Sequence, residues 1–383
     1  MPWKRETPMD QRVNLIKDWE SGNYTKSQLS RRYNVSRPTI DKWLRRYAAS
    51  GINGLRELSR KPVHCPHQTS AEVVAALVER KNAHPDRGPK QMIHRLRKEQ
   101  PSINWPAPST AGHWLDKLGL ITPRKVRQVR APSPNHLRSA DQPNQTWCAD
   151  FKGHFRMQDG RWCYPLTITD HASRYLIECR AFPSTHGDPV RQSFERAFNE
   201  LGLPDVVRTD NGAPFASTGL ARLSQLSVWL IRLGIHPEMI KPGRPDQNGR
   251  HERMHRTLKA SVLRNPSPDL ISQQLVFEEF MRDFNHDRPH TSLDMNEPAS
   301  VYHPSDRVYP GHLPLVDYDS DVIVRRVRSN GTMKWKGKLV FLGEAFVGEQ
   351  IALKEVDDDV WDLYLCSYVL GRLERGANRV SSL

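Results

Sequence analysis

Three acidic residues lie in three short strings of different character. Asp150 belongs to the strand-like string at 147–151, Asp210 to Arg-Thr-Asp-Asn-Gly at 208–212, and Glu252 to Asn-Gly-Arg-His-Glu-Arg at 248–253. If these side chains converge, each like-charged pair at about 4 Å costs on the order of 4 kcal/mol at an effective dielectric of about 20. Such a cluster persists only around a cation, and partly open carboxylate sites suit Mg²⁺ or Mn²⁺ bound together with phosphate oxygens. The three strings therefore predict phosphoryl transfer on nucleic acid.

The surroundings of each carboxylate support this interpretation. Asp150 lies in an apolar strand, where an idle carboxylate would be costly. Asp210 ends a buried-looking strand, which is where sites of α/β sheets lie. Glu252 lies in a polar helical turn, with Arg256 and Lys259 on the same face, where they could hold a phosphate backbone.

Each string also has an ordinary structural interpretation. Thr-Asp-Asn-Gly alone is a turn, and a glutamate in a polar helix is usually solvated. Two other aspartates compete as ligands, but Asp170 is better explained as a hairpin residue and Asp246 as a loop or cap residue. The sequence leaves His251 open: it could assist the nucleophile, touch phosphate or point outward.

The composition predicts a multidomain protein that works on a polyanion. The chain has 383 residues, a net charge of +14 and a pI of about 9.7, which favours nucleic acid as the partner. Its five cysteines form no CxxC pair, so a disulfide framework and a thiolate zinc site are not expected. No run of 18 apolar residues occurs. We therefore expect a cytoplasmic protein that acts on nucleic acid and has no membrane partner.

The first 60 residues have the pattern of a helix-turn-helix domain. A helix is predicted at 8–21, a second after the cap Thr25, and a third after the cap Ser36. The third helix presents four basic side chains that are predicted to bind DNA, namely Arg37, Lys42, Arg45 and Arg46. The alternative is a small helical bundle with a solvated basic face.

Residues 61–122 repeat this rhythm more weakly, as a second helix-turn-helix-like DNA-binding domain. Its helices are predicted near 73–78, from 89 and after the cap Ser109. The basic residues of this module are Arg87, Lys90, Arg95, Arg97 and Lys98, and Lys90 is a predicted DNA contact. Residues 123–143 form a basic linker, and the predicted backbone contacts there are Arg124, Lys125, Arg127 and Arg130.

The second half of the chain changes from helical to mixed and then to β patterns. Residues 144–312 predict strands at 146–155, 161–170, 174–182 and 205–209, with helices at 187–201, 219–232, 246–263 and 270–286. Strands followed by alternating strands and helices are typical of an α/β core. Residues 313–383 predict a small β-barrel with strands at 321–327, 332–340, 349–355 and 361–365. Lys334, Trp335 and Lys336 are predicted there to contact nucleic acid, unless the barrel serves only assembly.

Three stretches carry a family resemblance: Thr-Asp-Asn-Gly-Ala-Pro-Phe at 209–215, the Pro- and Gly-rich string at 241–249, and Glu252. The chain resembles bacterial insertion-sequence transposases of the DDE superfamily, which carry a retroviral-integrase-type core. The resemblance implies a ribonuclease-H-like fold for the core and an SH3-like barrel behind it. It also implies that Asp150, Asp210 and Glu252 are catalytic and hold two Mg²⁺ or Mn²⁺ ions. Forty-one residues separate Asp210 from Glu252, more than is usual in the family, and the extra length is predicted at 216–228.

The resemblance implies a reaction and its partners. Two metal ions would activate the nucleophile and stabilise the leaving oxygen, while the protein positions the phosphates. The expected function is binding of the element's terminal inverted repeats, cleavage at the ends and joining of the 3′ ends to target DNA. Pairing of two double-stranded ends requires self-association, at least a dimer. The alternatives are a non-catalytic DNA-binding protein derived from a transposase, and a ribonuclease-H-like nuclease without strand transfer.

Overall fold

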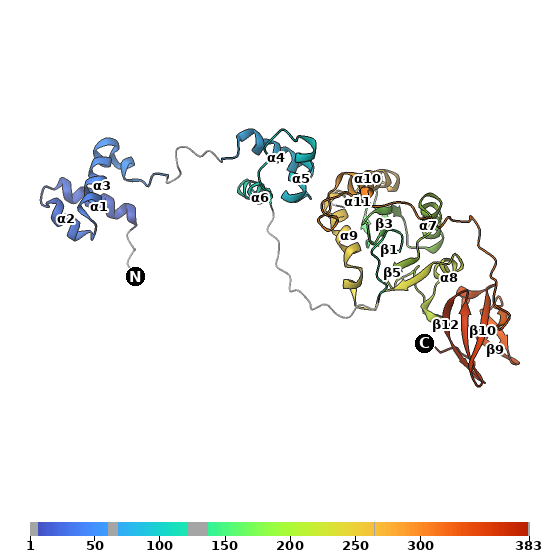
Figure 1. Cartoon of the computed structure of the whole chain (residues 1–383). Helices are drawn as coiled ribbons and strands as arrows, with labels where there is room; N and C mark the ends of the chain where they lie inside the picture. The colour runs from blue at the N-terminus through green and yellow to red at the C-terminus, as the bar shows by residue number, and fades with distance from the viewer. Residues whose placement is uncertain (1–6, 60–67, 122–136, 264, 382–383) are drawn as a thin grey trace. The chain divides into compact units, whose positions relative to one another are not determined.

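The computed structural model describes residues 7–59, 68–121, 137–263 and 265–381 (Figure 1). The described residues fall into two compact units, which divide between Gln68 and Thr69.

The first unit is a three-helix domain with a short 3-10 turn. Its elements are α1 (Pro8–Glu20), α2 (Lys26–Arg32), α3 (Arg37–Ser50) and η1 (Gly51–Leu55). Thr7 and Thr25 form capping boxes at α1 and α2, which explains why these helices begin there. The predicted helices are confirmed, but the hydroxyl of Ser36 contacts Thr39 Oγ1 and does not cap α3. Leu15 and Ile16 of α1 are buried, whereas Trp19 of the same helix is 38% exposed.

The second unit begins with another small helical module. It contains α4 (Ala71–Ala83), α5 (Pro89–Glu99) and α6 (Pro108–Lys117), packed around a core that includes Leu77, Ile93 and Trp105. A proline occupies the first turn of α5 and of α6, where its missing N–H costs nothing. The predicted cap Ser109 therefore lies inside α6, and Ala107 occupies the cap position.

A six-stranded mixed sheet forms the centre of the second unit. Its strands are β1 (Thr146–Phe151), β2 (Phe155–Arg156), β3 (Trp162–Asp170), β4 (Leu176–Phe182), β5 (Val206–Thr209) and β6 (His236–Met239). They lie in the order β4-β3-β1-β5-β6, and β2 pairs with the start of β3. β3 is antiparallel to β1 and β4, whereas β5 and β6 run parallel to β1. The sequence did not predict β6, a short strand that contains Pro237 and has few apolar residues.

Helices cover both faces of this sheet (Figure 1). Trp147 and Ala149 point to the face covered by α7 (Gly187–Leu201) and α8 (Gln225–Arg232). The opposite face packs against α9 (Gly249–Ser261) and α10 (Leu270–Arg282). Because side chains alternate along a strand, Asp150 points to this second face, away from the large aromatic core.

The chain between β5 and α9 is the part that the spacing of the acidic strings predicted to be long. It contains the short turn η2 (Leu220–Arg222) before α8 begins at Gln225. Leu223, Val228 and Ile231 from this connection belong to the hydrophobic cluster of the C-terminal sheet. The added length therefore gives the C-terminal sheet a surface on which to pack.

After α10 the chain forms a π-helical turn, η4 (Asp283–Asp287), then η5 (Thr291–Leu293) and α11 (Pro298–Val301). The C-terminal region contains β7 (Ile323–Arg326), β8 (Thr332–Trp335), β9 (Lys338–Phe341), η6 (Glu344–Phe346), β10 (Gln350–Asp357), β11 (Val360–Leu365) and β12 (Tyr368–Glu374).

These C-terminal strands form a sheet in the order β12-β11-β10-β7 and a separate hairpin of β8 with β9. The strand predicted at 332–340 is broken at Lys336 and Gly337, which both have positive φ and turn the chain back. The strand pairs of the described residues do not close into a barrel. None of the helices that the structure describes is long and apolar enough to cross a bilayer.

Candidate active site

Asp150 and Asp210 lie beside each other at the ends of neighbouring strands. β1 and β5 are parallel, and Ala149 pairs with Thr209, so the two aspartates occupy the next position in register. Adjacent strands lie about 4.8 Å apart, which brings the two residues close. The Asp210 carboxylate also accepts a hydrogen bond from the Gly212 N–H at 3.0 Å, which fixes the turn after β5.

Glu252 reaches this region from the first turn of α9. The buried face of this helix contains His251, Met254, His255 and Leu258, which pack toward the sheet, whereas Glu252 itself is exposed. α9 lies against β1 at this point, because His255, three residues after Glu252, has Nδ1 3.8 Å from an Asp150 carboxylate oxygen.

Both other acidic residues affect the pKa of Asp150. Its side chain is 23% exposed. Burial, together with the negative charges of Asp210 and Glu252, raises the pKa of Asp150 to about 7, although the Phe151 backbone and Lys152 act in the opposite direction. A bound cation would offset this repulsion between negative charges.

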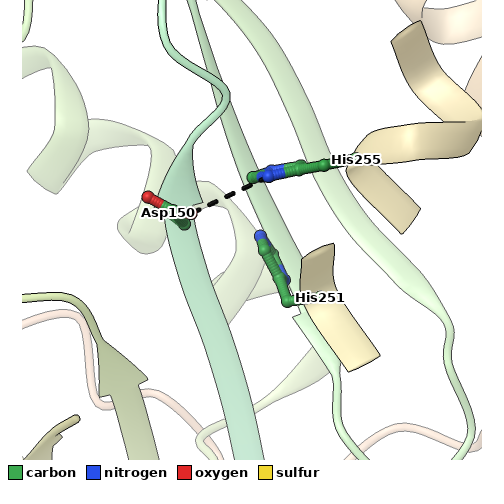
Figure 2. A group of neighbouring side chains, drawn as sticks. All are labelled: Asp150, His251 and His255. Atoms are coloured by element: carbon green, nitrogen blue, oxygen red, sulfur yellow. Dashed lines mark ion pairs between the residues drawn. The ribbon is translucent and has the colours of Figure 1, made fainter. Parts of the chain in front are cut away.

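The most compact group of possible metal-ligating side chains is not the three carboxylates. Among the described residues, the group whose possible ligand atoms all lie within 4.8 Å of one another is Asp150, His251 and His255 (Figure 2). Asp210 and Glu252 lie outside that compact group. The set predicted from the sequence and the set gathered by the fold therefore share Asp150.

The two histidines form a buried hydrogen-bond network with β3. Thr167 Oγ1 lies 2.8 Å from His251 Nε2 and 2.7 Å from His255 Nε2, and it donates to the Asp150 carbonyl at 3.1 Å. His251 Nδ1 lies 2.7 Å from Thr169 Oγ1. With the one Thr167 proton assigned to this carbonyl, both Nε2 atoms donate to Thr167. His251 Nδ1 then accepts from Thr169, and the network is satisfied with two neutral rings.

Burial agrees with neutral histidines. It lowers the pKa of His251 to about 3 and the pKa of His255 far below its usual range, with Lys152 acting in the same direction on both. The approach of His255 to Asp150 is therefore not a salt bridge at neutral pH. His251 is buried, so it does not point outward, and it contributes to the lining of the cleft described below.

The sequence interpretation missed His255, although a signal for it exists. Positions 251, 254, 255 and 258 have the spacing of one helix face, and two of them are apolar. This pattern places both histidines against the sheet. Asp170, by contrast, is the predicted hairpin residue: it is buried and accepts hydrogen bonds from the backbone of Ser173 and Asn144. The side chain of Asp246 lies outside the described residues.

A cationic cleft of about 770 Å³ runs beside α9. Its lining includes Arg250, Arg253 and Arg256 of α9, together with Arg174 and Lys90. Burial and the charge of Arg250 lower the pKa of Arg174 to about 10. In the part of the chain that the structure describes, none of these five cations has a carboxylate partner. Lys259 is also exposed on α9, outside the cleft lining.

The basic face of the second helical module differs from its prediction. Arg87 is buried and paired with Asp283, and Arg95 pairs with Asp287 at 2.6 Å. Lys98 lies 3.1 Å from Glu297, and in the reverse direction Arg288 pairs with Asp86 of the module. Most of this face is therefore engaged in contacts within the chain, because carboxylates around η4 and α11 neutralise it. Lys90 remains exposed.

The four predicted contacts of α3 have different surroundings. Lys42 and Arg45 are exposed. Arg37 is exposed and donates to Ser27 Oγ. Arg46 is half-buried, donates to the Arg56 carbonyl and stacks 4.7 Å from the Trp43 ring, so its contacts support the fold.

At the C-terminal sheet the prediction for one residue is wrong. The Trp335 side chain is 6% exposed and packs edge-on against Trp361 at 5.2 Å, so it belongs to the core and cannot stack on a base. Lys334 and Lys336 are exposed, and Lys336 lies over the Trp361 ring. The linker contacts Arg124, Lys125, Arg127 and Arg130 lie outside the described residues.

Family models match most regions of the chain. An integrase core domain matches residues 140–245, and a second integrase core model matches 233–298. A helix-turn-helix domain matches 11–62 and a homeodomain-like domain matches 39–115. The C-terminal domain of IS481 family transposases matches 322–380.

Two bacterial proteins and one viral structure illustrate the similarity. The chain is 28% identical over 241 residues to the insertion element IS476 uncharacterized 39.2 kDa protein of Xanthomonas euvesicatoria, covering 62% of this chain and 66% of that protein. It is 26% identical to the insertion element IS407 uncharacterized 31.7 kDa protein of Burkholderia multivorans, covering 58% and 72%. The HTLV-2 integrase catalytic core domain in complex with magnesium covers 42% of this chain and 98% of its own, with 17% identity and a TM-score of 0.34.

Proposed function

We propose that this chain, a member of the insertion-sequence transposases with an integrase-type core, binds the terminal inverted repeats of its own element, cleaves DNA there and joins the 3′ ends to target DNA. The observation that carries the proposal is that Asp150 and Asp210 follow directly after the paired residues Ala149 and Thr209 of the parallel strands β1 and β5. The charges of Asp210 and Glu252 both act to raise the pKa of Asp150. The repulsion among three carboxylates from β1, the end of β5 and α9 does not stabilise the fold, whereas phosphoryl transfer requires such a cluster.

The donor set fits divalent metal ions. Carboxylate oxygens are the ligands of Mg²⁺ and Mn²⁺ in phosphoryl-transfer sites. Asp150, Asp210 and Glu252 would hold two such ions, with Glu252 contributing through a rotamer change that its exposed position allows at small cost. When bound, the ions supply nucleophile activation and leaving-group stabilisation. The residues themselves contribute a negative, partly buried pocket and a fixed separation between β1 and β5.

The cleft beside α9 supports a nucleic-acid substrate. Its five cations that have no carboxylate partner among the described residues provide several phosphate-binding groups, and Arg256 stands one helical turn beyond Glu252. None of the three carboxylates lines the cleft, so a backbone held there would reach them past Arg256 on α9. Positioning of this kind is the main task of a protein in phosphoryl transfer. We also propose that Lys334 and Lys336 contact DNA, that two copies of the chain pair two ends, and that the protein acts in the bacterial cytoplasm.

The direct test is nicking of a duplex that carries the terminal repeats of the element. Purified full-length protein should cut this duplex when Mg²⁺ or Mn²⁺ is supplied, and should not cut it in the presence of a chelator. Nicking that is indifferent to chelation would contradict the proposal.

Proton competition at Asp150 leads to a pH prediction. The pKa of Asp150 is about 7 in the folded chain, against 3.8 for the ordinary side chain, so the fold favours the protonated form. In metal-free protein, the stability from this group is complete below about pH 4 and is lost as the pH rises through about 7. Metal requires the ionised form, so its apparent affinity should fall by up to about tenfold per pH unit below pH 7.

The measurement is the rise in unfolding temperature on adding Mg²⁺ to the full chain. This rise should be larger near pH 8 than near pH 6, and Asp150→Asn should remove most of the rise at both values. A Mg²⁺ effect in wild type that is equal at both pH values would argue against Asp150 as a ligand.

The exposed cations of α3 lead to a salt prediction. Replacing Lys42 and Arg45 with alanine should weaken binding to the terminal repeats. A protein that makes fewer phosphate contacts releases fewer counterions when it binds DNA. The slope of log affinity against log salt should flatten by about 0.9 for each contact, measured by fluorescence anisotropy. Lys17→Ala, which removes an exposed charge near the end of α1, is the matched control. An unchanged slope in the double variant would exclude phosphate contacts by α3.

A further inference from the structure

One nitrogen in the buried histidine network has no hydrogen-bond partner. With the Thr167 proton assigned to the Asp150 carbonyl, both Nε2 atoms donate to Thr167 Oγ1. His251 Nδ1 is used by Thr169. His255 Nδ1 is left as a bare lone pair, and among the residues that the structure describes it forms no hydrogen bond. It faces the carboxylate of Asp150 (Figure 2).

The distance between these two atoms suits a shared ion. His255 Nδ1 and Asp150 Oδ2 are 3.8 Å apart, too far for a hydrogen bond. Two ligands that bind one ion at about 2.1 Å each can stand up to about 4.2 Å apart. A lone pair directed toward an ionised carboxylate is unfavourable, and a cation between the two groups would remove this repulsion.

The other side of the His255 ring is arranged as in a metal-binding histidine. A ligating imidazole almost always donates its second N–H to an oxygen, which fixes the tautomer and the ring orientation. His255 Nε2 donates to Thr167 Oγ1 at 2.7 Å, and Thr167 is itself held by the Asp150 backbone at 3.1 Å. The imidazole is therefore already oriented with its free nitrogen toward Asp150.

We propose that His255 Nδ1 is an additional protein ligand of the divalent ion held by Asp150. The inference rests on the proposed function only in requiring that a divalent ion binds at Asp150. His251 is a positioning residue, since hydrogen bonds with Thr167 and Thr169 occupy both of its nitrogens. The site then has mixed oxygen and nitrogen ligands.

A nitrogen ligand changes which ions the site prefers. Mg²⁺ and Ca²⁺ favour oxygen ligands, whereas Mn²⁺, Co²⁺ and Zn²⁺ accept imidazole and bind it more tightly along that series. Wild-type protein should therefore bind Mn²⁺ in preference to Mg²⁺. His255→Asn, which cannot offer a ring nitrogen, should reduce the ratio of Mn²⁺ to Mg²⁺ affinity about tenfold or more.

The test is electron spin-echo spectroscopy of Mn²⁺ bound to the full-length chain without DNA. Wild type should show modulation from one directly bound histidine nitrogen. His255→Asn should bind Mn²⁺ without this modulation, whereas His251→Gln should retain it, because His255 keeps its bond to Thr167. Asp150→Asn should greatly weaken Mn²⁺ binding, which assigns the signal to this site.

The outcomes separate the inference from the proposed function. Mn²⁺ bound at Asp150 without nitrogen modulation in wild type would overturn the inference, even if the protein cuts DNA. Equal modulation in His255→Asn would also overturn it. Nitrogen modulation that depends on His255 and Asp150 would support it, even if the protein never cleaves its DNA ends. Because the decisive reading is made on wild type, a variant that fails to fold does not leave the question open.

Discussion

Asp210→Asn should abolish metal-dependent nicking of a duplex that carries the terminal repeats, with a loss on the order of a thousandfold or more. Asparagine has nearly the same shape, and its side-chain oxygen can still accept the hydrogen bond from Gly212 that holds the turn after β5. What it lacks is the negative charge beside Asp150. The substitution therefore removes one of the proposed ligands and part of the repulsion at Asp150 without disturbing the strand.

Binding to the same duplex should be preserved in this variant, since the exposed cations of α3 and of the α9 cleft are untouched. The two measurements are a gel assay for nicked strands and fluorescence anisotropy for binding. Asp205→Asn is the matched control, because Asp205 is an exposed aspartate that directly precedes β5 and pairs with Arg307. If Asp210→Asn nicks the duplex at the wild-type rate, Asp210 does not belong to the active site.

Thr167→Val should have the second largest effect, through the position of α9. The Thr167 hydroxyl accepts from two buried histidine N–H groups and donates to the Asp150 carbonyl. Valine keeps the size of the side chain but leaves these donors unpaired, at about 1–3 kcal/mol for each buried group. We expect a lower unfolding temperature, faster amide exchange in α9, and weaker nicking because Glu252 is less well placed.

Thr169→Val is the control for that experiment. Its hydroxyl makes a single bond, to His251 Nδ1, so the loss should be smaller and exchange in the first turn of α9 should change least. If the two threonine variants behave alike, or if α9 keeps its protection in Thr167→Val, the network does not hold the helix against the sheet.

Local patterns predicted much of the secondary structure. α1, α7 and β3 lie within a residue or two of their predicted ranges, because caps, alternation and helical spacing are properties of neighbouring residues. The prediction failed where short elements depend on distant partners. β6 has only four residues and is stabilised by pairing with β5, and the turn at Lys336 splits one apparent strand into two.

The roles of charged side chains were harder to predict. Arg87, Arg95 and Lys98 have the spacing of a DNA-binding face, yet carboxylates around η4 and α11, nearly two hundred residues away, pair with them. Trp335 lies between lysines in the sequence but packs on Trp361 in the core. Whether a cation is free for DNA depends on which carboxylate the fold brings near it, and that is a long-range property.

By itself, the sequence determined the apolar strand around Asp150 and the basic helix behind Glu252, and it predicted the three carboxylates of the proposed site. These follow from residue type and short-range spacing. Only the tertiary structure decided that Asp150 lies in register with Asp210, and that His255 turns a free nitrogen toward Asp150. The physical reason is that strand pairing and helix packing join segments about a hundred residues apart, and the proton assignments of the two histidines follow from contacts made only after that packing.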